Sequence, residues 1–205
     1  YRALRLLVET SQNRVVSCLA REGGLSTTLW AGPEKIGAMV REGIVPVEGT
    51  RRQEVVRLLL GFAEEDFGYM IDLGLPTPST ALFQLDPVIK REVVWHGELL
   101  TPSSMLVDRS NMHLRVRNDD WETVSTCLRL NDSMMAQFAH PEKSPEILVV
   151  RERLRSWRFY DQFRTDADAP VRRQQVATYT PVLGNDGDDL AAALKTIDLY
   201  GDSAA

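Results

Sequence analysis

The chain is poor in cysteine and histidine. Its two cysteines, Cys18 and Cys127, lie far apart with no second ligand at metal-binding spacing. Two cysteines in 205 residues favour a reducing compartment over a disulfide-stabilised scaffold, so the cytoplasm is the expected location. The three histidines, His96, His113 and His140, are equally scattered. The sequence therefore predicts no metal site.

Long apolar runs are also absent, since none approaches the roughly 18 residues that a membrane-spanning helix needs. We therefore expect no membrane contact. The composition includes 43% hydrophobic and 26% charged residues, which argues against disorder and against a coiled coil. A net charge of -5 weighs against a chain that coats nucleic acid over its whole surface, although a local basic patch is compatible with it.

The spacing of apolar residues divides the chain into parts. Over residues 1–22 they recur at helical spacing, which predicts an amphipathic helix that Gly23 and Gly24 end. The following residues, up to 49, show no period. From 55 to 126 the period is two, which predicts an antiparallel meander with one polar face.

Helical spacing returns after residue 131. Apolar residues from 147 to 157 predict a helix behind Pro145, and either Asp188 or Asp189 can cap a further helix. The predicted fold class is α/β, of the α+β kind. It comprises an N-terminal helix and connector (1–50), an antiparallel β subdomain (51–130) and a helical segment (131–205).

Several blocks along the chain resemble one family. In chain order they are Tyr1–Leu7, Gly23–Leu25, Leu29–Pro33, Asp66–Tyr69, Asp72–Pro76, Leu85–Glu92, Asp132–Gln137, Ser156–Asp161 and Leu183–Leu194. The blocks and their order are similar to those of predicted ATPases of the ABC/RecF-like class, often labelled AAA-type. No block is by itself a catalytic motif, but together they span nearly the whole chain.

The resemblance implies a P-loop ATPase head. Residues 1–50 would hold the helix that follows the phosphate-binding loop, 51–130 the inserted β subdomain, and 131–205 the start of the helical lobe. It also implies ATP and Mg²⁺ as cofactors of the complete protein, the remainder of the head as a partner, and a homodimer that sandwiches ATP. The process to which ATP hydrolysis would be coupled stays open, with DNA transactions and defence among the options.

The sequence departs from this family in its catalytic motifs. It contains no Gly-x-x-x-x-Gly-Lys-Ser/Thr loop and no Leu-Ser-x-Gly signature. The run Ile147–Glu152 resembles a Walker B strand in ending on an acid, but it includes Arg151 and follows a helical period. Without these groups phosphoryl transfer lacks its positioning elements. We therefore expect an interior piece of an ATPase that does not hydrolyse ATP alone.

Gln137 is the candidate cofactor-binding residue, in a role that the resemblance implies. It stands where the meander gives way to the helical segment, the place where the resembled ATPases carry a Gln that reports Mg-ATP between lobes. The alternative is a solvent-facing Gln in a surface turn. Gln84 is a weaker rival for the same role.

A basic stripe is the candidate nucleic-acid site. Arg151, Arg155 and Arg158 fall at positions i, i+4 and i+7, and Arg164 follows. Such a stripe can contact DNA or RNA phosphates, with a nearby aromatic residue stacked on a base. The alternative is a solvated helix face whose arginines pair with neighbouring acids.

The acidic run Asn185–Asp189 superficially suggests a calcium loop, but its oxygen donors do not follow the EF-hand order. A turn and a helix cap explain it better. The leading functional hypothesis is thus part of a P-loop ATPase. The alternative hypothesis is a non-enzymatic α/β binding module for a protein or nucleic-acid partner. A Gly-x-x-x-x-Gly-Lys-Ser/Thr motif encoded upstream of Tyr1 would favour the first.

Overall fold

The computed structural model describes residues 1–29, 37–44, 55–77, 83–161 and 163–201. The chain forms two compact units, here called the N-terminal unit (Tyr1–Arg155) and the C-terminal unit (Ser156–Ala205). Each unit is described by itself. The division falls inside the segment 131–205 that the sequence assigned to one helical lobe.

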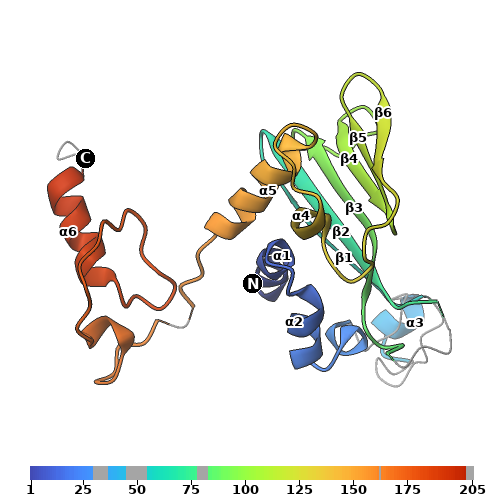
Figure 1. Cartoon of the computed structure of the whole chain (residues 1–205). Coiled ribbons are helices and arrows are strands. Elements are labelled where there is room, and N and C mark those ends of the chain that lie inside the picture. Colours follow the sequence, from blue (N-terminus) through green and yellow to red (C-terminus); the bar gives the residue numbers. More distant parts are fainter. Residues whose placement is uncertain (30–36, 45–54, 78–82, 162, 202–205) are drawn as a thin grey trace. The chain divides into compact units, whose positions relative to one another are not determined.

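The N-terminal unit consists of short helices and one sheet (Figure 1). Its elements are α1 (Arg2–Ser11), α2 (Val15–Arg21), the 3-10 helix η1 (Leu25–Thr28), α3 (Ala38–Arg41), β1 (Arg57–Ala63), β2 (Phe67–Gly74), β3 (Val88–His96), β4 (Met105–Ser110), β5 (His113–Arg117), β6 (Trp121–Ser125), α4 (Met134–Gln137) and α5 (Pro145–Ser156), whose last residue crosses into the second unit.

The sheet is a six-stranded meander in which each strand pairs antiparallel with the next, in the order β1 to β6. Its first two strands form a hairpin, in which the Glu64 backbone N–H donates to the Phe67 carbonyl at 3.0 Å. The helix–meander–helix order and the α+β class predicted from apolar periodicity are therefore confirmed.

The opening segment differs from the predicted single helix because it breaks at Asn13. This residue has a φ of 60°, in the left-handed region that asparagine tolerates and that ends helices. The backbone then restarts as α2, while Arg14 binds the Glu9 carboxylate of α1 at 2.6 Å. Helical spacing continues across the break, which is why periodicity alone does not reveal it.

One face of the sheet, here called the inner face, forms the core. Figure 1 shows α1, α4 and α5 on one side of the strands. Fully buried apolar side chains come from β2 (Tyr69, Ile71, Leu73), α1 (Leu7), α4 (Met134, Met135) and α5 (Ile147, Val150, Leu154). Each such side chain contributes about 1.5–3 kcal/mol by leaving water. Burial at 147, 150 and 154 confirms three members of the predicted apolar stripe, whereas the fourth, Trp157, lies beyond the end of α5 at Ser156.

The C-terminal unit contains η2 (Pro170–Arg172) and α6 (Leu190–Tyr200). Asp189 occupies the predicted N-cap position, but its carboxylate accepts the Gly184 N–H at 2.9 Å instead of capping the helix. The Tyr160 hydroxyl donates to the Leu183 carbonyl at 2.8 Å. Two of the blocks that carry the family resemblance, 156–161 and 183–194, therefore meet within this unit.

Candidate functional site

A buried ion pair lies at the centre of the N-terminal unit. Glu92 on β3 and Arg109 on β4 are opposite each other in register, and both side chains are 0% exposed. Arg109 Nη1 donates to Glu92 Oε2 at 2.6 Å. Charges removed from water are tolerated only when their remaining hydrogen-bonding groups are also satisfied.

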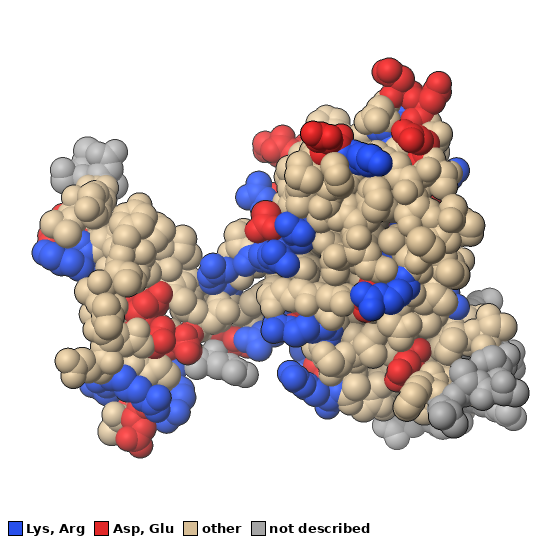
Figure 2. Space-filling model, in the orientation of Figure 1, with Lys and Arg blue, Asp and Glu red and all other residues tan. Residues whose placement is uncertain are grey.

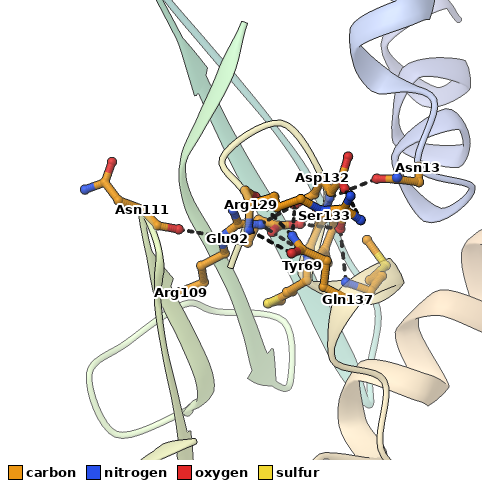
Figure 3. A network of polar contacts seen from close by, with 11 residues as sticks. Asn13, Tyr69, Glu92, Arg109, Asn111, Arg129, Asp132, Ser133 and Gln137 are labelled. Carbon is orange, nitrogen blue, oxygen red and sulfur yellow. Dashed lines mark hydrogen bonds and ion pairs between the residues drawn. The ribbon is translucent and has the colours of Figure 1, made fainter. Parts of the chain in front are cut away.

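The Glu92 carboxylate meets that condition with three further donors (Figure 3). Oε1 accepts the Tyr69 hydroxyl at 2.7 Å and the Ser133 hydroxyl at 2.6 Å. Oε2 accepts the backbone N–H of Met134 at 2.8 Å. The carboxylate thus joins two strands of the sheet to the first turn of α4.

Arg109 completes the arrangement by binding backbone carbonyls. Its guanidinium donates to Asn111 at 2.8 Å, to Asp132 at 2.7 Å and to Arg129 at 2.8 Å. The loop between β6 and α4 is therefore fixed by an arginine from the middle of the sheet. We call Tyr69, Glu92, Arg109 and Ser133 the polar hub.

Burial raises the pKa of the Tyr69 hydroxyl well above its ordinary value, and the negative charge of Glu92 raises it further. The hydroxyl consequently keeps its proton and remains a donor to the carboxylate at neutral pH. This cluster is a set of hydrogen-bond donors gathered around one carboxylate.

The polar hub also reaches the first helices. The Ser133 backbone N–H donates to Asn13 Oδ1 at 3.2 Å, so the turn between α1 and α2 is tied to the start of α4. The Ser133 hydroxyl caps α4 by accepting the Met135 N–H at 3.1 Å. Asn13, whose left-handed backbone ends α1, thus has a second function in this contact.

Gln137 lies at the end of α4, beside the polar hub (Figure 3). Its Oε1 accepts the Arg129 N–H at 2.7 Å, and its Nε2 donates to the carbonyls of Arg129 and Asp132 at 3.0 and 2.8 Å. Arg109 and Gln137 therefore hold the same two carbonyls. The side chain is half-buried and bound to the loop. Its rival Gln84 is exposed.

The predicted stripe does not continue along one helix, because α5 ends at Ser156, before Arg158 and Arg164. Arg151 and Arg155 lie on α5 in the N-terminal unit, where both bind Glu152, at 3.0 and 3.4 Å. Arg158 and Arg164 belong to the C-terminal unit. Arg164 binds Asp166 through two nitrogens, at 2.8 and 2.7 Å. On the face of the N-terminal unit in view, Figure 2 shows several basic side chains over α5 and the first helices, and a group of acidic side chains at the tip of the β5–β6 hairpin.

The described residues do not by themselves fit Mg-ATP. The sequence has no phosphate-binding loop, and in the described ranges no three His, Cys, Asp or Glu side chains are grouped to hold a metal ion. Asp189, in the acidic run, instead accepts the Gly184 N–H. Within the same ranges, no helix combines the length and the apolar character that a membrane span requires.

Sequence reasoning gave no role to Tyr69, Glu92 or Arg109. A sequence signal was available, because a glutamate in a strand rich in branched residues and an arginine in the next strand can neutralise each other across a sheet. Finding the pair requires the β3–β4 register, which shifts between Val94 and Trp95.

Scanning the chain against protein-family models gives no match, and neither does a search of curated proteins or of solved structures.

Proposed function

We propose that this chain is part of a P-loop ATPase, and that the complete protein binds and hydrolyses ATP with Mg²⁺. The chain alone is not catalytically competent, because it lacks the loop that would hold the phosphates. In the complete protein two heads would sandwich ATP as a homodimer.

One observation carries the proposal. Three of the blocks that resemble the ATPase family are distant in sequence, yet their side chains meet in the polar hub. The block 66–69 supplies Tyr69, the block 85–92 supplies Glu92, and the block 132–137 supplies Ser133 and lies against Arg109. A shared structural centre gives a physical reason for these blocks to occur together.

The polar hub also suits the coupling that such an ATPase needs. By resemblance, α1 follows the phosphate-binding loop and Gln137 reports the nucleotide between lobes. The contact from Asn13 to Ser133 and the bonds from Arg109 and Gln137 to the 129–132 loop connect these two elements. Such a connection would hold Gln137 at a fixed position relative to α1.

The test is ATP turnover by the complete protein carrying Gln137→Ala. We expect turnover to fall on the order of 10- to 100-fold, because a displaced positioning group costs about that much, while nucleotide affinity stays nearly unchanged. Gln84→Ala is the matched control and should leave turnover intact. Thermal unfolding of both variants separates a local effect from loss of the fold.

Unchanged turnover in Gln137→Ala would remove the role of this residue. A complete protein that binds no ATP would remove the whole proposal.

The alternative, a non-enzymatic binding module, is favoured by a different feature. On the sheet face opposite the core, Arg57, Arg91 and Arg115 are half-exposed, with 62%, 42% and 49% of their side chains accessible. They lie on alternate strands and can meet an anionic partner, including nucleic acid. Salt-sensitive binding of DNA without any nucleotide binding would favour this alternative.

A further inference from the structure

The first strand of the sheet is covered less completely than the second. β1 is an edge strand, with β2 as its neighbour. On the inner face of β2, Tyr69, Ile71 and Leu73 are 0% exposed, whereas Leu58 and Leu60 of β1 are only half-buried. Within the described residues, the core therefore ends incompletely at β1.

Within the described residues, no strand pairs with the edge of β1 that faces away from β2, and the strand itself lacks several of the usual protections. Natural edge strands avoid further pairing by means of proline, lysine or inward-pointing charges. Between Arg57 and Ala63 none of these occurs, and Leu59 is 57% exposed on the opposite face. An apolar edge of this kind is suited to accept another strand.

The backbone alternation identifies the groups that face this edge. The Glu64 N–H bonds to the Phe67 carbonyl, so by alternation Leu58, Leu60 and Phe62 bond to β2. The N–H and C=O groups of Leu59, Gly61 and Ala63 then point away from β2. They are the donors and acceptors that an added strand would use.

A cleft of about 710 Å³ adjoins the inner side of β1. It is lined by residues of α1, α2, η1 and β1, and its large apolar side chains are Leu6, Leu19, Leu58 and Leu60. It gives room for the inward side chains of an added strand. Those side chains would complete the burial of Leu58 and Leu60.

The charged lining of the cleft is unbalanced. It contains Arg2, Arg5, Arg21, Glu9 and Glu22. Glu9 binds Arg14 at 2.6 Å and Glu22 lies 3.7 Å from Arg2, so both carboxylates are engaged. Arg21 forms no ion pair with any residue that the structure describes. A carboxylate on the occupant would complement it.

We propose that β1 is the docking edge for one further β-strand supplied by the remainder of the ATPase head. The strand pairs with the backbone of Leu59, Gly61 and Ala63, sets apolar side chains against Leu58 and Leu60, and carries an acidic residue toward Arg21. The identity of the donor rests on the proposed function, whereas the docking edge itself rests on the geometry of β1 and the cleft.

A second copy of this chain is the weaker occupant. Pairing of two β1 strands would bring only the residues Arg57–Ala63 to the cleft, and this segment contains no carboxylate. Arg21 would then lie beside a neutral or basic strand. The charge of the cleft thus favours a different segment of polypeptide.

Hydrogen–deuterium exchange at single-residue resolution tests the proposal. In the 205-residue chain the amides of Leu59, Gly61 and Ala63 should exchange rapidly, while those of Leu58 and Leu60 are protected by β2. In the complete protein all five should be protected. Rapid exchange at the first three in the complete protein, or a gene that encodes only these 205 residues, would overturn the proposal.

A pair of variants separates docking from folding. Leu59→Pro removes an edge-facing N–H that β2 does not use, so the chain alone should fold with a melting temperature close to that of the control Leu59→Thr. In the complete protein, only Leu59→Pro should abolish protection at Gly61 and Ala63. Equal protection in both variants would contradict strand addition at this edge.

Further outcomes separate the docking edge from a second copy of the chain and from the proposed function. Concentration-dependent protection in the chain alone, with a dimer in sedimentation, would overturn the proposal in favour of a second copy. Protection in a complete protein that binds no ATP would leave the docking edge standing while the proposed function fails. ATP binding by a complete protein whose β1 amides are not protected would overturn the docking edge and leave the proposed function standing.

Discussion

Both faces of the sheet carry ion pairs between neighbouring strands, but the pair on the inner face is buried and the pair on the outer face is in contact with water. On the inner face, Glu92 and Arg109 are 0% exposed. On the outer face of the same two strands, Arg91 binds Asp108 at 2.9 Å with 42% of the arginine side chain accessible. Arg91 and Glu92 are adjacent on β3, as Asp108 and Arg109 are on β4, so the members of each adjacent pair point to opposite faces. The alternation of side chains along the two strands therefore decides which ion pair is buried.

The outer charges form a row across the sheet. Arg57 binds Asp72, Asp72 lies opposite Arg91, and Asp108 also binds Arg115 at 2.6 Å. The Arg115 guanidinium lies 5.1 Å from the ring centroid of Trp121. In this row the carboxylates are buried, while the guanidinium groups remain in contact with water. Water can therefore replace a lost outer partner, as it cannot in the polar hub.

The largest expected effect follows from breaking the inner pair. Arg109→Met leaves the Glu92 carboxylate buried without its countercharge, which costs about 3–5 kcal/mol of unfolding free energy. Urea denaturation of the chain measures it. The double variant Glu92→Gln, Arg109→Met should lose less than the sum of the two single variants, because no uncompensated charge remains. A loss below about 1 kcal/mol in Arg109→Met would contradict a dry pair.

A smaller effect is expected on the outer face. Arg91→Ala removes one half-exposed partner of Asp108, which retains Arg115. We expect a loss of about 0–1 kcal/mol in unfolding free energy, and a smaller one at 1 M salt than at low salt because exposed charges are screened. A loss as large as that of Arg109→Met would eliminate the distinction between the two faces.

The smallest effect concerns a pair in full contact with solvent. A hydrogen bond from Arg164 lowers the pKa of Asp166 from 3.8 to about 2. Since the folded-state pKa is depressed, any stabilisation by this pair is present above pH 3.8 and is lost as the pH falls through about 2. In Arg164→Ala, a carboxyl titration by NMR should return the pKa toward 3.8, without a measurable change in melting temperature. An unchanged pKa of Asp166 would contradict the assignment of its shift to Arg164.

The sequence predicted the parts of the fold that depend on period. Burial alternates along residues 57–63, large apolar residues occupy every second position from Phe67 to Leu73, and buried apolar residues of α5 follow one helical stripe. The break at Asn13 was not predicted, since helical spacing continues through it. The helix α4 has only four residues, which is too few to show a period.

The candidate site was less predictable for a related reason. The position of Gln137 at the end of the meander follows from the chain order, but the direction of its side chain depends on carbonyls at 129 and 132. Pairing of Glu92 with Arg109 depends on a register that contains a bulge. The functional assignment itself remains a proposal based on resemblance and on the polar hub.

The most direct test of the central proposal is calorimetric titration of Mg-ATP into the complete protein and, in parallel, into the 205-residue chain. The account predicts saturable binding by the complete protein and none by the chain, whose sequence lacks the phosphate-binding loop. Absence of binding by the complete protein would contradict it.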